Sequence, residues 1–517
     1  MIPMIPLAIP PLWTADAFEI EARQAAPTQS RLWRFHDEYV LGTRLEVLVN
    51  SHSEMLAREA AHVVRREIER LDRVFNHRRS DSEVSALNQL RLINASADLF
   101  AVTQLSETWR RITRGAFDAR MGELLGLWAA DTAPDRPAFE QTLVALRDSK
   151  VTLDPVGRQI ELSSGAILSL DAVAKGYIVD AALSAARAAV PAIEGLAIEI
   201  GGDIRCWGES PDCRGWRIGI PDPAIPVVNA PLVDAILLRN AAIATSGRGP
   251  RDFVGRGCRS TTVSPFTGRP VREVISASVV ASHAADADAI ATACLVLRPK
   301  ESLALISGLD GIAARITDAD GRVHASRDWS TLQLAATAPE DHITPRGAKD
   351  PSLPPELRWP SDWEVLINYI APERQDSRSA DFRTPYMAVW ITDAQNRSVR
   401  TVLMVGRDPD WQRDNFIWWG THRERAERLV ELRSQATTLS GRYTMSWMGV
   451  DDDWKRMPLG KYTLHLETSQ ERGKHSYRSM TIELGRERIK TELPNLPDSG
   501  GMEISYGHYN DRYKATE

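Results

Sequence analysis

Residues 333–360 are rich in proline and show no hydrophobic periodicity, and they divide the chain into two parts with different sequence patterns. Proline fixes φ and removes a backbone donor, so such a stretch is typical of a semi-rigid linker. A chain of 517 residues is also too long for one ordinary hydrophobic core. We therefore expect a flexible arm at 1–30, a first domain at 31–332, a linker at 333–360 and a second domain at 361–517.

The first part mixes helical and strand patterns. Val64, Ile68, Leu71 and Phe75 form the stripe of a long helix that follows a possible capping box at Ser51 and Glu54,. Further helices are expected at 99–114 and after Asp171, and strands at 38–50, 195–207, 216–220, 232–244 and 275–281. Because the elements do not alternate as βαβ units, this pattern predicts an α+β domain.

The second part is typical of an all-β domain. Short alternating segments bounded by turn residues predict strands at 363–371, 385–392, 399–405, 441–448, 460–467 and 477–484,. A helix is expected only around 421–432. This pattern favours an immunoglobulin-like sandwich in which the tryptophans belong to the core.

Composition excludes several functions. The net charge is −6 and the pI is near 6.1, so we expect no nucleic-acid partner, because phosphate binding needs a basic surface. The sequence contains no run of 18 apolar residues, so no membrane-spanning helix is predicted,. Residues 1–11 are apolar but lack a basic region and are interrupted by prolines, so they do not predict a clear secretory signal,.

A candidate metal site lies in the apolar run from His283 to Leu297. On a helix, the Asp288 carboxylate and the Thr292 hydroxyl would lie on one face, one turn apart, whereas Asp286 could not share that face,. Two hard oxygen ligands suit Mg²⁺, which completes its octahedron with water and substrate phosphates. The alternative is a solvated aspartate and a threonine bonded to its own helix.

Two further segments suit a phosphate. Residues 168–180 are expected to begin as a strand and turn into a helix through Ala174, Lys175 and Gly176, where small residues and a helix N-terminus let an anion approach,. Lys175 adds a cation there, although a solvated surface lysine is the alternative. Gly201 and Gly202 end another apolar strand and allow close contact.

These segments, with Ala242–Gly247 and Pro265–Gly268, resemble the FAD:protein FMN transferase (ApbE) family in the family's order. Three upstream elements extend the resemblance over residues 36–325: Leu41-Gly42-Thr43, Asp81-Ser82-Glu83 with Asn88, and Gly115-Ala116-Phe117-Asp118 followed by Leu124 to Trp128. The C-terminal part resembles a family of predicted periplasmic domains of unknown function through the segments 385–390, 441–449 and 460–464.

The resemblance implies an enzyme that moves the FMN half of FAD onto a Ser or Thr hydroxyl of an acceptor protein and releases AMP. It implies Mg²⁺ on Asp288, Thr292 and the backbone carbonyl of Ala174, with Asp288 and Lys175 as the catalytic residues. It also implies that FAD is held by Leu41, Arg78, Ala116, Phe117, Asp118, Asp171, Tyr177 and Thr262, although Phe117 could equally be a core residue. Family members usually act outside the cytoplasm, so a periplasmic or membrane-associated location is expected.

The chain departs from the family pattern at several positions. Thr261 and Ser264 stand where the family has His and Asp, and Arg78 stands where it has an aromatic residue. Ser169 replaces the family Asp, with an Asp at 171 instead. Because a candidate proton acceptor is missing, these departures bear on the rate more than on binding.

Three functions remain open at this stage. They are an Mg²⁺-dependent FMN transferase, which we favour, an FAD pyrophosphatase that uses water in place of the acceptor, and a non-catalytic flavin-binding or partner-binding module. Residues 434–437, Ser-Gln-Ala-Thr, resemble the Ser/Thr-x-Ala-Thr core of the acceptor motif, so the chain could carry its own acceptor at Thr437. The alternative is a polar turn between two elements.

Overall fold

The computed structural model describes fourteen segments of the chain. They are residues 31–129, 135–211, 214–225, 227–247, 262–334, 353–360, 363–371, 386–405, 414–422, 432–433, 441–452, 455–469, 474–496 and 499–508. Thr261 and Thr437 lie outside the described residues, as does most of the proline-rich segment.

An antiparallel sheet forms the centre of the first domain. Its described strands follow the order β1-β2-β6-β7-β10-β11-β12-β13. They are β1 (Arg31–Val40), β2 (Thr43–Ser51), β6 (Gly195–Ile200), β7 (Asp203–Gly208), β10 (Ala242–Gly247), β11 (Val274–Ala281), β12 (Ala313–Asp318) and β13 (Val323–Ala325). Together with the helices below, this sheet confirms the predicted α+β domain.

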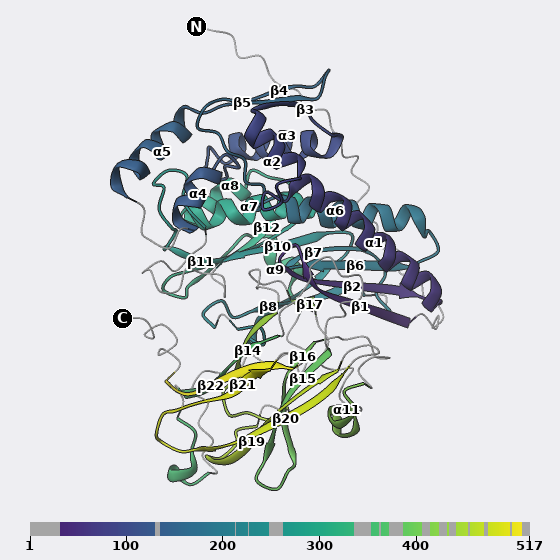
Figure 1. Cartoon of the computed structure of the whole chain (residues 1–517), viewed down its shortest axis with the longest axis vertical. Helices are drawn as coiled ribbons and strands as arrows, with labels where there is room; N and C mark the ends of the chain where they lie inside the picture. Colours follow the sequence, from purple (N-terminus) through teal and green to yellow (C-terminus); the bar gives the residue numbers. More distant parts are fainter. Residues whose placement is uncertain are drawn as a thin grey trace.

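Three helices cover one face of this sheet (Figure 1). They are α1 (Glu54–Phe75), α6 (Ala174–Ala189) and α7 (Ala284–Val296). The predicted stripe of α1, including Val64 and Leu71, is buried in the main core against strand residues such as Leu45. Smaller elements surround the helices: α2 (Glu83–Leu90), α3 (Ala97–Ile112), α4 (Gly122–Ala129), α5 (Arg136–Asp148), α8 (Pro299–Ile306), α9 (Trp329–Leu332), and β3 (Leu92–Asn94), β4 (Val151–Asp154) and β5 (Gln159–Leu162).

A second layer covers the opposite face of the sheet. The hairpin of β8 (Trp216–Pro221) and β9 (Leu232–Leu238) packs there through Ile218 and Ile236 against Ala197 and Ile243. β17 (Leu432–Arg433), which comes from the second half of the chain, pairs in parallel with β8.

The second domain is a sandwich of two antiparallel sheets below the first domain (Figure 1), in the orders β18-β14-β22-β21 and β16-β15-β19-β20. This arrangement confirms the predicted all-β class. The strands are β14 (Trp363–Ile370), β15 (Tyr386–Asp393), β16 (Ser398–Val405), β18 (Arg442–Trp447), β19 (Gly460–Ser469), β20 (His475–Leu484), β21 (Ile489–Leu496) and β22 (Gly500–His508). Trp359 and Trp447 pack in its core, with ring centroids 5.0 Å apart.

The two domains are joined by the β8–β9 connection as well as by β17. Val228 N–H donates to the Thr444 carbonyl at 2.8 Å. The Asn229 amide donates to the Ser446 carbonyl at 2.8 Å and accepts from the Ser446 N–H at 2.9 Å. The side-chain amide of Asn229 therefore bonds the backbone of β18 as a neighbouring strand would.

Several predicted elements were wrong in detail. The strand expected at 38–50 is a hairpin, because Leu41 and Gly42 take positive φ values of 52° and 73° and form its turn. The N-cap of α1 is Ser53, not Ser51. Residues 168–170 form no strand; instead the Asn88 side chain bonds both the N–H and the carbonyl of Leu168. In the second domain α11 spans Phe416–His422, and most of the helix expected at 421–432 lies outside the described residues.

Candidate active site

The candidate site lies where α6 and α7 cross. Gly176 on α6 brings the two helices close together: a Cβ atom at this position would lie 2.3 Å from the Ala284 carbonyl oxygen. Four residues further along α6, the Asp180 carboxylate accepts hydrogen bonds from the N–H groups of Ala284 and Ala285, each at 3.0 Å. These are the first two amides of α7, which have no partner within their own helix. α6 therefore caps α7.

Asp288 lies one turn into α7 and is almost completely buried, with 3% of its surface exposed. It accepts a hydrogen bond from the Gly176 N–H, and its Oδ2 lies 3.8 Å from Lys175 Nζ. Among the residues that the structure describes, Oδ2 has no hydrogen-bond partner. Burial and the neighbouring carboxylate of Asp203 raise the pKa of Asp288 to about 7. This buried oxygen is suited to a cation.

Lys175 connects Asp288 to a second buried carboxylate. Its ammonium forms an ion pair with Asp203, of which 1% is exposed. Asp203 begins β7 directly after Gly201 and Gly202, whose φ values of 58° and 95° form the two-residue turn of the β6–β7 hairpin. Positive φ at both positions is the geometry that favours glycine. Two carboxylates and one ammonium leave the cluster with a net negative charge.

Thr292 completes the predicted pair on α7. It is half-buried, and its hydroxyl lies 3.2 Å from that of Ser246, near the end of β10. Asp286 does not share this face; its carboxylate accepts from the Trp109 indole N–H on α3 at 2.8 Å. Ala174 is the first residue of α6. In the described part of the chain no group of three or more His, Cys, Asp or Glu side chains could hold a metal ion, so a metal here would also need hydroxyl, carbonyl or substrate oxygens.

Four of the predicted FAD residues gather near the start of α6. Tyr177 packs edge-on against Phe75, at the end of α1, and donates to Asp98 at 3.0 Å. His77, two residues after α1, forms an ion pair with Asp171 at 3.3 Å, which raises the pKa of His77. The exposed Arg78 lies beside the Leu41–Gly42 turn. The residues at the C-terminal end of α1 and just after it therefore lie between the β1–β2 turn and the N-terminus of α6.

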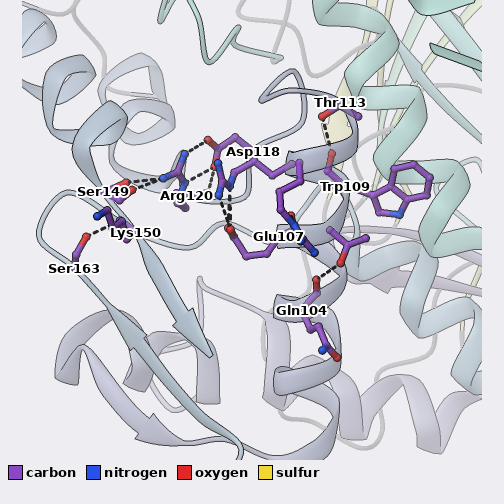
Figure 2. A network of polar contacts seen from close by, with 12 residues as sticks. Gln104, Glu107, Trp109, Thr113, Asp118, Arg120, Ser149, Lys150 and Ser163 are labelled. Atoms are coloured by element: carbon purple, nitrogen blue, oxygen red, sulfur yellow. Dashed lines mark hydrogen bonds and ion pairs between the residues drawn. The ribbon is translucent and has the colours of Figure 1, made fainter. Parts of the chain in front are cut away.

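The segment Ala116-Phe117-Asp118 is held firmly in the fold. Phe117 is 1% exposed and belongs to the main core, in line with the core alternative. Both oxygens of Asp118 accept from the Arg120 guanidinium, at 2.9 and 2.5 Å, and Arg120 also reaches Ser149 (Figure 2). A contact between this segment and FAD stays a prediction, and it would come most readily from backbone atoms.

Thr262 begins a small hairpin that packs on α4 and α5. Its carbonyl accepts from the Val271 N–H at 3.0 Å, and Val263 packs against Met121 and Leu146. The Trp128 indole N–H donates to the Gly268 carbonyl at 2.8 Å. Ser264 is buried within this hairpin.

Four residues of the site were missing from the predicted set. Asp203 and Asp180 are buried carboxylates beside Lys175 and α7, Ser246 contacts Thr292, and Asn88 holds Leu168. Each lies within a recognisable motif or directly beside one. The sequence signal was therefore present for all four residues, but their contacts depend on tertiary packing.

The comparisons with known proteins agree with this architecture. The chain is 30% identical over 313 residues to the FAD:protein FMN transferase of Treponema pallidum, covering 56% of this chain and 85% of that protein. It is 32% identical over 302 residues to the FAD:protein FMN transferase of Rhodobacter capsulatus, covering 56% of each. The crystal structure of the ApbE protein of Thermotoga maritima superposes with a TM-score of 0.54 at 25% identity, covering 59% of this chain and all of that one.

The first domain is therefore similar, in sequence and in fold, to proteins named as flavin transferases. The family model described as the ApbE family matches residues 41–316, which is more than half of the chain, and the chain belongs to that family. This confirms the family predicted from the motifs, and the enzyme class with it. A second family model, described as a predicted periplasmic protein (DUF2271), matches residues 370–497.

Proposed function

We propose that this protein is an Mg²⁺-dependent FAD:protein FMN transferase that modifies a Ser or Thr hydroxyl of an acceptor protein and releases AMP. The observation that carries the proposal is the buried Asp288 carboxylate, whose Oδ2 has no hydrogen-bond partner among the described residues and faces Lys175. A buried carboxylate oxygen that accepts no hydrogen bond is costly unless a cation binds it when the protein works.

The residues present fit Mg²⁺. Asp288 and Thr292 offer two hard oxygens one turn apart on α7, and the carbonyl of Ala174 is the third predicted protein ligand. When bound, the ion would neutralise charge on the pyrophosphate of FAD. Lys175 would support the phosphates, with Asp203 holding its ammonium in place.

The reaction is a displacement at phosphorus. The acceptor hydroxyl oxygen forms a bond to the phosphorus that carries riboflavin, and the bond from that phosphorus to the bridging oxygen breaks. AMP leaves with the bridging oxygen, and the hydroxyl proton passes to solvent. The protein supplies positioning and charge stabilisation, which account for most catalysis of phosphoryl transfer.

Incubation with FAD, Mg²⁺ and a peptide carrying a Ser/Thr-x-Ala-Thr segment tests the proposal. We expect an FMN adduct on the peptide by mass spectrometry and equimolar AMP by chromatography, both lost on removal of Mg²⁺ and in Asp288→Asn. Asp286→Asn is the matched control, because Asp286 is a half-buried carboxylate of the same helix that faces Trp109 instead. AMP release without a peptide adduct would indicate a pyrophosphatase, and FAD binding without AMP a non-catalytic module; either result would refute the transferase.

The acceptor is a separate protein or the chain's own Thr437, which lies outside the described residues. Residues 434–437, Ser-Gln-Ala-Thr, support the second case through their resemblance to the acceptor motif. If Thr437 is the acceptor, incubation with FAD and Mg²⁺ should add an FMN moiety to the chain, and the adduct should be absent in Thr437→Val.

An extracytoplasmic location completes the proposal. It is supported by the match of the second domain to a family described as predicted periplasmic. Among the described residues, no helix is long and apolar enough to cross a membrane. Fractionation of cells that produce the full chain would test this location.

A further inference from the structure

The helices α6 and α7 cap each other. Asp180 on α6 accepts from the N–H groups of Ala284 and Ala285 at the start of α7. In return, Asp288 on α7 accepts from the N–H of Gly176 in the first turn of α6. The amides of Gly176, Ala284 and Ala285 lack partners within their own helices, and each of the three is satisfied by a carboxylate of the other helix.

The Asp180 side of this pair is rigidly built. Arg205 on β7 lies 3.2 Å from the same Asp180 oxygen that accepts from Ala284. Both charged side chains are 15% exposed. Asp180 is thereby fixed to the sheet and to α7 together, and it has little freedom to shift.

We propose that Asp180 is a positioning residue for the reaction, because it fixes the position of the first turn of α7 relative to α6. In that position Asp288 accepts from the Gly176 N–H and keeps its Oδ2 directed toward the ligand position beside Lys175. The inference rests on the proposed function for the identity of the ligand, Mg²⁺. Asp180 itself contacts backbone amides and Arg205, and it acts on the reaction through the placement of Asp288.

The alternative is that Asp180 serves only to stabilise the helix. His283, the N-cap residue of α7, has an extended backbone and makes no side-chain cap bond. His283→Ser would provide a local cap for the first turn of α7, but it would not tie α7 to α6. Adding this change to Asp180→Asn therefore separates helix stability from helix placement.

Two measurements on the full chain test the inference. The first is the dissociation constant for Mg²⁺ by calorimetry, and the second is hydrogen–deuterium exchange of the Gly176 amide. In Asp180→Asn, and equally in the double variant with His283→Ser, we expect Mg²⁺ binding at least tenfold weaker and faster exchange at Gly176. The control is Trp109→Phe, which removes a hydrogen bond to α7 from α3 rather than from α6, and it should leave both values unchanged.

Wild-type Mg²⁺ affinity and Gly176 protection in a folded Asp180→Asn would overturn the inference. So would an equal loss in Trp109→Phe, because the effect would then follow general destabilisation. If neither Asp180 variant folds, the residue serves the fold alone and the inference is wrong. If the wild-type chain binds no Mg²⁺, the proposed metal fails instead, and exchange at Gly176 still decides whether Asp180 positions Asp288.

Discussion

Replacing Gly176 by alanine should destabilise the first domain, although the same change in an exposed helix is stabilising. Alanine exceeds glycine in helix propensity by about 1 kcal/mol. At Gly176, however, the added Cβ would lie 2.3 Å from the Ala284 oxygen and 2.6 Å from the Ala285 nitrogen, both of them backbone atoms. These atoms cannot rotate away, so α7 itself has to move.

The size of the effect follows from that movement. Normal contact requires a shift of about 1 Å, and the hydrogen bonds of Asp180 to Ala284 and Ala285, now 3.0 Å, would then exceed hydrogen-bond distance. Each bond to a charged group contributes about 1.5–3 kcal/mol, so two weakened bonds outweigh the propensity gain. We expect a net loss of about 2–3 kcal/mol, near the usual cost of overpacking.

Thermal unfolding of the first domain measures this loss, which corresponds to a decrease in Tm of roughly 4–8 °C. Gly126→Ala is the matched control, because Gly126 also lies within a helix but has no atom within 4 Å of the added Cβ. Its Tm should stay the same or rise. A Gly176→Ala variant as stable as wild type, with unchanged Mg²⁺ affinity, would refute the close helix contact on which the site is built.

Three further changes test other parts of the chain. Asp288→Asn should abolish Mg²⁺-dependent transfer yet retain the fold. The folded-state pKa of Asp288 is raised from 3.8 to about 7, so without Mg²⁺ the wild-type protein should lose stability as the pH rises from 4 to 7, and Asp288→Asn should lose less,. Burial lowers the pKa of His465 from 6.5 to about 4. The sandwich should therefore lose up to about 3 kcal/mol of stability as the pH falls from 6.5 to 4,, and urea titrations of His465→Gln should no longer show this pH dependence. Thr261→His should raise the transfer rate at saturating FAD; an unchanged rate would mean that this position does not face the reacting atoms.

Sequence patterns predicted the class of both domains because hydrophobic periodicity reports directly which face of an element is buried. They failed where a single residue changes the direction of the chain. The strand expected at 38–50 breaks at Leu41, a bulky residue held at positive φ, and the strand expected at 232–244 breaks at Asn240, with φ of 48°. β21 (Ile489–Leu496) was not predicted: its exposure alternates only over its first six residues, and it contains Pro494, a residue that argues against a strand.

The candidate site shows the same limit. The spacing of Asp288 and Thr292 predicts that they share a face of one helix, because the helical period fixes it. No local rule predicts that Asp203 would meet Lys175, since β6–β7 and α6 are brought together only by the packed sheet. The same holds for Asp180 and α7, which are more than 100 residues apart in sequence. Residues within one element could be predicted, and partners across elements could not.

The departures at Thr261 and Ser264 affect the chemistry of the hairpin more than its placement. Its backbone is held by groups outside those two positions: Trp128 binds the Gly268 carbonyl, Arg147 binds the Phe266 carbonyl at 3.0 Å, and Val263 packs in the cluster below. Ser264 takes part through its backbone, donating to Arg269 at 2.9 Å and accepting from Gly268 at 2.7 Å. Bonds of this kind do not depend on which side chain is present. A histidine introduced at 261 would therefore directly precede a hairpin whose described residues, from Thr262 on, are already held in place, and a change in rate would report on proton transfer rather than on refolding of the hairpin.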